Sequence, residues 1–132
     1  MIIKNAMVYT EEGIFEKKDI YIRDGKFVDL AQEEDEIVDG EGCYAIPGLT
    51  DIHFHGCVGR DFCDGTEEAI QAIADYEASV GVTTIVPATM TFSEDKLTQI
   101  ARAARAHKNE KGAILCGTNM EGPFIAMKKK GA

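Results

Sequence analysis

The stretch GLTDIHFHG, residues 48–56, marks the point where the chain changes from short β hairpins to alternating strands and helices. Residues 1–47 contain short apolar runs separated by turn signals, and Asp24-Gly25 is typical of a hairpin. Beyond the stretch, three apolar runs, at 49–55, 82–90 and 113–122, are separated by two helical patterns. Such alternation predicts a parallel sheet with helical crossovers, in an open sheet or a closed barrel.

Both helices carry recognisable start and stop signals. Thr66 is expected to cap the first helix, which Gly81 should end. Ser93 is expected to cap the second helix, which Gly112 should end. His107 then falls near the negative end of the second helix, where a cation is favourable.

Composition excludes several classes of partner. The chain has 14 basic and 23 acidic residues, a net charge of -9. An acidic chain gains nothing from a polyanion, so we expect neither nucleic-acid binding nor attraction to an anionic membrane. The N-terminus lacks a secretory pattern, and no apolar run is long enough to span a bilayer. Four irregularly spaced cysteines then indicate reduced thiols in a cytoplasmic protein.

The two histidines of the stretch are candidates for a metal site. Side chains alternate along a strand, so Asp51, His53 and His55 should share one face at the C-terminal end of the first parallel strand. In a barrel, that end is where active sites gather. Glu121, at the end of the third strand, is the candidate third ligand, because two imidazoles and a carboxylate suit a catalytic zinc ion.

Other interpretations of these residues stay open. His53 and His55 could only form hydrogen bonds at a sheet edge, and Glu121 could be a surface carboxylate before a turn. Asp51 could orient an imidazole or only stabilise the nearby turn. A zinc site made of the two histidines with Cys57 and Cys63 is also conceivable.

The segment AIPGLTDIHFHG (45–56) resembles the amidohydrolase superfamily, in which a metal-binding HxH follows the first barrel strand. The segment GTNMEGPFIAMKKKGA (117–132) is similar to the part of N-acetylglucosamine-6-phosphate deacetylases that carries a metal-binding glutamate. The HxH is shared by many amidohydrolases, whereas the glutamate segment is more specific. Together the motifs cover essentially the whole chain.

The resemblance implies a fold and a site. Residues 1–47 would be the N-terminal part of a small β-sandwich, and residues 48–132 the first three βα units of a (β/α)8 TIM-type barrel, incomplete as given. His53, His55 and Glu121 would be ligands of one or two divalent ions, zinc or another metal such as iron. Ala132 would lie at the substrate, and a dimer is expected of the full-length enzyme.

The resemblance also implies an activity, namely hydrolysis of N-acetylglucosamine 6-phosphate to glucosamine 6-phosphate and acetate. The family's catalytic aspartate, later histidine ligands and phosphate-binding residues find no match here, so we name no catalytic residue and expect the chain alone to be inactive. Two alternatives remain. One is another amidohydrolase, acting on a cyclic amide or by deamination; the other is a non-catalytic association module.

Overall fold

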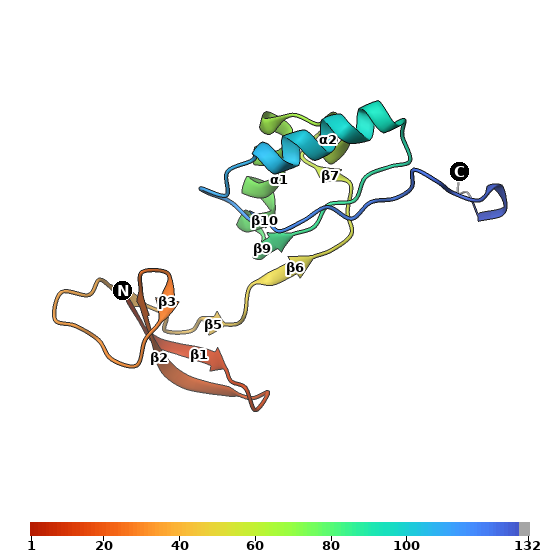
Figure 1. Cartoon of the computed structure of the whole chain (residues 1–132). Coiled ribbons are helices and arrows are strands. Elements are labelled where there is room, and N and C mark those ends of the chain that lie inside the picture. Colours follow the sequence, from red (N-terminus) through yellow and green to blue (C-terminus); the bar gives the residue numbers. More distant parts are fainter. Residues whose placement is uncertain (130–132) are drawn as a thin grey trace. The chain divides into compact units, whose positions relative to one another are not determined.

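The computed structural model describes residues 1–129, and the chain divides into two compact units between Pro47 and Gly48 (Figure 1). Unit 1 consists of strands alone. Unit 2 contains both helices and a three-stranded parallel sheet. The mixed α/β class predicted from the sequence is therefore confirmed.

Unit 1 is a five-stranded sheet in which β1 is the central strand. Its antiparallel partner is β2, which continues into β3 through a hairpin, while β4 and β5 pair with β1 in parallel. The strands are β1 (Ile2–Tyr9), β2 (Phe15–Arg23), β3 (Lys26–Phe27), β4 (Ile37–Asp39) and β5 (Tyr44–Ala45).

The predicted hairpin at Asp24-Gly25 is confirmed. The two residues have φ of 50° and 70°, the combination that a tight two-residue turn between antiparallel strands requires. The run at 37–48 forms two short strands, β4 and β5. It breaks because the chain turns between them, where the Cys43 N–H donates to the Gly40 carbonyl.

Unit 2 follows the predicted order of strand, helix, strand, helix, strand. Its parallel sheet has the order β10-β9-β6, so strands that follow one another in sequence are neighbours. A short hairpin, β7 and β8, lies between β6 and the first helix. The elements are β6 (Leu49–Asp51), β7 (Gly56–Cys57), β8 (Arg60–Asp61), the 3-10 turn η1 (Phe62–Asp64), α1 (Glu67–Ser79), β9 (Val82–Ile85), α2 (Glu94–Ala106), β10 (Ile114–Leu115) and the 3-10 turn η2 (Met127–Lys129).

Both predicted N-caps are confirmed. The Thr66 hydroxyl accepts from the N–H of Ala69 at 3.2 Å, and the Ser93 hydroxyl accepts from the N–H of Lys96 at 3.4 Å. Each bond gives an acceptor to a backbone N–H that the helix itself leaves unpaired. Acidic residues occupy both first turns, where the helix dipole favours them.

The predicted end of α2 at Gly112 is wrong, because the helix ends at Ala106. His107 leaves the helical conformation, and its side chain, 1% exposed, places Nδ1 at 2.9 Å from Oε1 of Glu67 at the start of α1. His107 was expected as a cation near the end of α2. It is instead buried, and its contact with Glu67 joins α2 to α1. The partner lies 40 residues away, so the sequence pattern could not show it.

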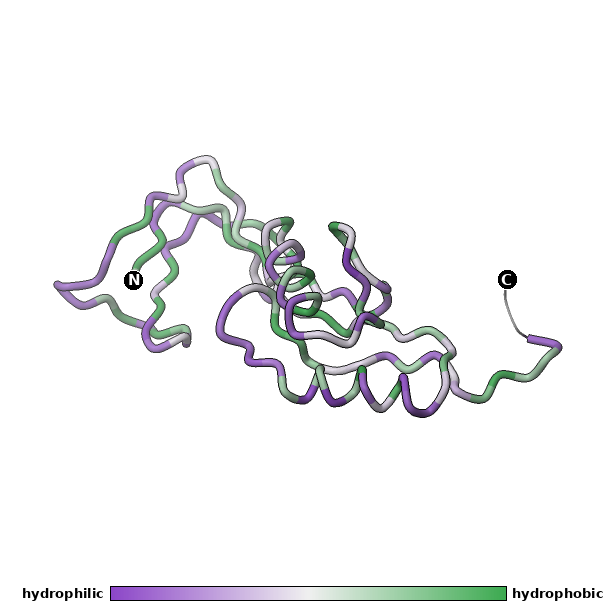
Figure 2. The backbone as a smooth tube through the Cα atoms, turned by 90° about the horizontal axis from the view of Figure 1, so that it is seen from above, coloured by the Kyte–Doolittle hydropathy of each residue, from purple (hydrophilic) through white to green (hydrophobic). Residues whose placement is uncertain are grey.

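The core of unit 2 lies between the helices and the sheet. It is formed by Phe62, Cys63, Ile70, Ile73, Ala74, Ile85, Leu97, Ile100 and Ala113. Burying each large apolar side chain contributes about 1.5–3 kcal/mol. Figure 2 shows hydrophobic and hydrophilic residues alternating along the helices, as expected when one face of each packs inward.

Two close backbone contacts fix how the segments of unit 2 meet. A Cβ on Gly48 would lie 2.0 Å from the Thr83 hydroxyl, so only glycine fits where β6 begins beside β9. The N–H of Ala113, just before β10, donates to the Ala74 carbonyl within α1 at 2.8 Å. The chain after α2 is therefore bonded directly to the backbone of α1.

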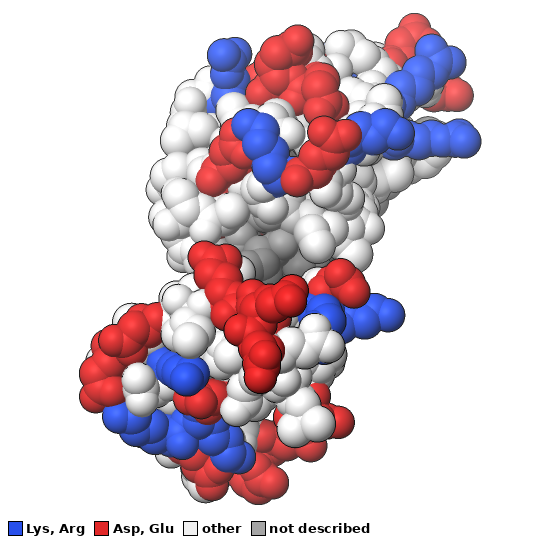
Figure 3. Space-filling view, turned by 90° about the vertical axis from the view of Figure 1, so that its left-hand side faces the viewer, with Lys and Arg blue, Asp and Glu red and all other residues white. Residues whose placement is uncertain are grey.

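Figure 3 shows charged side chains of both signs scattered among uncharged residues on the face that it draws. Among residues 1–129, neither helix is long and apolar enough to cross a membrane.

Candidate functional site

His53 and His55 lie just beyond β6 rather than within it. The strand was expected to continue to His55, but it ends at Asp51, whose carboxylate accepts from the N–H of His53 at 3.0 Å and offers the backbone a local bond in place of a ladder bond. The expectation of a regular strand through the histidines is therefore wrong.

The imidazoles nevertheless come close together. Their ring centroids are 5.5 Å apart, with the ring planes nearly perpendicular. Phe54, between them in sequence, packs against the core, and its carbonyl accepts from the N–H of Ala88 at 2.7 Å. The chain beyond β6 thus stays bonded to the chain beyond β9, which holds the histidines at the end of the sheet.

His53 contacts the segment that follows β10. Nδ2 of Asn119 lies 3.1 Å from Nδ1 of His53 and donates to the carbonyl of Ile52 at 2.9 Å. The backbone of Asn119 is also fixed, since its N–H donates to Pro87 and its carbonyl accepts from Thr89. The imidazole of His53 therefore has a defined partner from another strand.

His55 is half-buried, and its Nδ1 is buried without a hydrogen-bond partner. Buried polar atoms in proteins are nearly always paired, so this nitrogen marks a place where an ion, a water or a ligand group could bind. The carbonyl of His55 accepts from the N–H of Phe62 at 2.8 Å, which closes the loop that contains β7 and β8.

Glu121 is half-buried and is held through its backbone. Its N–H donates to the hydroxyl of Thr89 at 3.1 Å. The next residue, Gly122, has φ of 82° and approaches Thr91 so closely that a Cβ would lie 2.9 Å from the Thr91 hydroxyl. Both contacts attach the Glu121 turn to the chain beyond β9.

The three predicted ligands do not form a closed set in this structure. Among residues 1–129, no group of three or more histidine, cysteine, aspartate or glutamate side chains lies close enough to hold a metal ion. The paired imidazoles and the unpartnered Nδ1 of His55 fit the donor chemistry of a divalent ion, whereas Glu121 is not gathered with them. The three-ligand site remains a prediction.

The cysteines near the histidines serve other contacts. Burial, and then the negative charge of Glu77, raises the pKa of Cys57 to about 11. Sγ of Cys63 is buried and accepts from the N–H of Met90 at 3.3 Å. Burial also raises the pKa of this thiol, and among residues 1–129 neither cysteine joins the two histidines in a cluster that could hold a metal ion.

Asn119 and Thr89 are the site residues that the sequence interpretation missed. Asn119 precedes Glu121 by two residues, so strand alternation could have placed both on one face. The role of Thr89 depends on its contact with a segment 32 residues away, which no local pattern reveals. The predicted substrate residue Ala132 lies outside the described residues.

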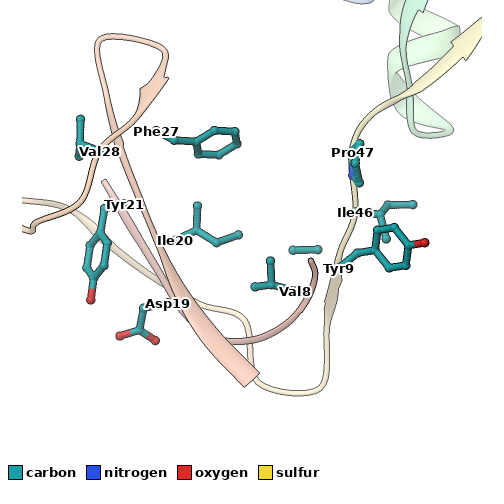
Figure 4. A pocket seen from close by; sticks show the side chains of 10 residues that line it. Val8, Tyr9, Asp19, Ile20, Tyr21, Phe27, Val28, Ile46 and Pro47 are labelled. Carbon is teal, nitrogen blue, oxygen red and sulfur yellow. The ribbon is translucent and has the colours of Figure 1, made fainter. Parts of the chain in front are cut away.

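A concavity of about 410 Å³ lies wholly within unit 1. Figure 4 shows Ile20 and Phe27 on one side of it and Ile46 and Pro47 on the other. The one carboxylate in its lining, Asp19, accepts from the backbone N–H of Asn5 at 3.1 Å. Its lining contains neither histidine nor cysteine, so the histidine pair of unit 2 is the better candidate for chemistry.

The fold and the site define an α/β protein whose polar residues gather at the C-terminal ends of parallel strands. No family model matches the chain. The N-acetylglucosamine-6-phosphate deacetylase of Lysinibacillus sphaericus is 29% identical over 138 residues, which is 100% of this chain and 36% of that relative.

Solved structures give the same result. A deacetylase of this name from Thermotoga maritima is 29% identical with a TM-score of 0.78, covering 100% of this chain and 35% of that one. The structure from Pasteurella multocida has a TM-score of 0.87 at 20% identity, covering 98% and 36%, and supports the fold alone. The chain is therefore related to N-acetylglucosamine-6-phosphate deacetylases and matches their N-terminal portion, about a third of their length.

Proposed function

We propose that the chain is the N-terminal part of a metal-dependent deacetylase that converts N-acetylglucosamine 6-phosphate to glucosamine 6-phosphate and acetate. The observation that supports this most is the match of the whole chain to relatives of that name. In this proposal, unit 2 contains the first three βα units of a (β/α)8 barrel. Unit 1 forms part of a small β-sandwich.

The proposed metal site consists of His53, His55 and Glu121, with one or two divalent ions, zinc in the first instance. A divalent ion bound there would act as a Lewis acid toward the acetamide carbonyl. The chain's own contribution is to hold the ligands: Asp51 fixes the backbone at His53, and the Thr89 hydroxyl fixes the backbone at Glu121.

The remaining parts of the proposal concern substrate and setting. Ala132 is the proposed substrate contact, and the proposed substrate is a phosphorylated amino sugar. The full-length enzyme is proposed to be a dimer. The proposed location is the cytoplasm, which suits four unpaired thiols. We assign no catalytic residue, and therefore expect the chain alone to bind an ion but not to turn over substrate.

The test is zinc binding to the purified chain, measured by equilibrium dialysis with elemental analysis, beside acetate release from N-acetylglucosamine 6-phosphate. His53→Ala and His55→Ala should each lower zinc affinity at least ten-fold, whereas Lys108→Ala, an exposed control, should not. Equal zinc affinity in all four proteins would overturn the proposed site. A panel of cyclic amides and amino-substituted bases tests the alternative amidohydrolase activities.

A further inference from the structure

The side chain of Asn119 contacts both the backbone of Ile52 and the ring of His53. Its Nδ2 donates to the Ile52 carbonyl at 2.9 Å and lies 3.1 Å from Nδ1 of His53. A carboxamide nitrogen carries two hydrogens and accepts none, so one nitrogen can serve both neighbours as a donor.

The Ile52 carbonyl settles which way the carboxamide points. If the amide were turned over, Oδ1 would face the Ile52 oxygen, and two acceptors would meet without a hydrogen between them. Nδ2 therefore faces His53 as well. Nδ1 of a neutral His53 must accept, and the ring proton must lie on Nε2.

We propose that Asn119 is a positioning residue that fixes the orientation of the His53 ring and holds its proton on Nε2. The backbone of Asn119 is bonded on both sides to the chain beyond β9, so the carboxamide is presented from a fixed support. Asn119 fixes the ring of His53 in this way without a bound metal ion.

The second part rests on the proposed function. An ion at Nε2 of His53 displaces the proton from that nitrogen, and the proton of a neutral ligand must then lie on Nδ1. Nδ1–H would face the N–H of Asn119, a donor against a donor. Ion binding through Nε2 thus requires the carboxamide to turn and give up its bond to Ile52, so Asn119 opposes it.

Two substitutions separate these effects. Asn119→Asp presents only acceptors, so it should draw the His53 proton to Nδ1 and support ion binding at Nε2, as carboxylates beside ligating histidines do. Asn119→Ala removes the donor without adding an acceptor. The expected order of zinc affinity is Asn119→Asp, then Asn119→Ala, then the unsubstituted chain. The zinc affinity of Asn119→Ala should exceed that of the unsubstituted chain roughly two- to ten-fold, which is the scale of one hydrogen bond.

The decisive measurement is the ¹⁵N NMR spectrum of the histidine rings in the metal-free chain at pH 8. The chain has three histidines, so each ring can be assigned by substitution. We expect Nδ1 of His53 to show the shift of an unprotonated acceptor, and Asn119→Asp to give it the shift of a protonated nitrogen. The ring of His107, bonded to Glu67, is the internal control and should not change.

Three results would overturn the inference. A His53 proton on Nδ1 in the unsubstituted chain refutes the tautomer, and an unchanged His53 spectrum in Asn119→Asp refutes the positioning role. Zinc binding that is tightest in the unsubstituted chain refutes the opposition to metal. If no variant binds zinc, the proposed metal site fails, and the metal-free spectra still decide the role of Asn119.

Discussion

Removing the hydroxyl of Thr89 should loosen the Glu121 turn without altering Glu121 itself. The Thr89 side chain is 2% exposed, and its oxygen accepts from the Glu121 N–H at 3.1 Å. In Thr89→Val a methyl group takes the place of that oxygen, so the N–H loses its acceptor. An unpaired buried donor lowers the free energy of unfolding by about 1–3 kcal/mol. Because Glu121 is only half-buried, we expect the lower part of this range, about 1–2 kcal/mol.

The assay is urea unfolding followed by circular dichroism. With a slope of about 2 kcal/mol per M, the midpoint of Thr89→Val should fall by about 0.5–1 M while the slope stays unchanged. Thr98→Val is the matched control, because Thr98 is exposed on α2 and its change should stay within about 0.5 kcal/mol. Equal midpoints for the two variants would refute the role assigned to the Thr89 hydroxyl.

Three further predictions concern unit 2. Phe62→Ala should lower the free energy of unfolding by about 3–5 kcal/mol, because Phe62 is 1% exposed. Phe124→Ala is the control and should change it by less than about 0.5 kcal/mol, because Phe124 is 97% exposed. Similar losses for the two variants in urea melts would contradict the assigned core. Glu67→Ala leaves Nδ1 of the buried His107 ring without its partner and should lower the free energy of unfolding by about 1–3 kcal/mol. Glu68→Ala, at the neighbouring exposed position, is the control. Equal thermal melting temperatures for the two variants would argue against the contact. Since the pKa of Cys57 is raised to about 11, its alkylation by iodoacetamide should be slow at pH 8 and should accelerate as the pH rises toward 11. Mass spectrometry follows the reaction at each cysteine. If Cys57 reacted at pH 8 as fast as the exposed Cys43 and Cys116, the raised pKa would be contradicted.

The sequence predicted those elements whose signals are local. Thr66 and Ser93 cap helices because a hydroxyl before a helical pattern can reach the first free N–H groups, and this needs no distant partner. The hairpin at Asp24-Gly25 is local in the same sense. The end of α2 differs from the expected Gly112: the helix ends at Ala106, and the ring of His107 pairs with Glu67, 40 residues away, which no local pattern shows.

The candidate site divides in the same way. Strand alternation brought His53 and His55 to one place, and their rings do lie near one another, although the strand ends earlier than expected. What holds the site could not be predicted, since Asn119 and Thr89 act across segments 66 and 32 residues apart.

The bond from the Ala113 N–H to the Ala74 carbonyl makes this amide a reporter of α1. Ala113 belongs to no helix or strand, yet it is fully buried, and its N–H can meet solvent only when the loop separates from the helix. In a hydrogen–deuterium exchange experiment, the Ala113 amide should therefore exchange more slowly than the amides of a surface loop. Its exchange rate would measure how often the segment that enters β10 separates from α1.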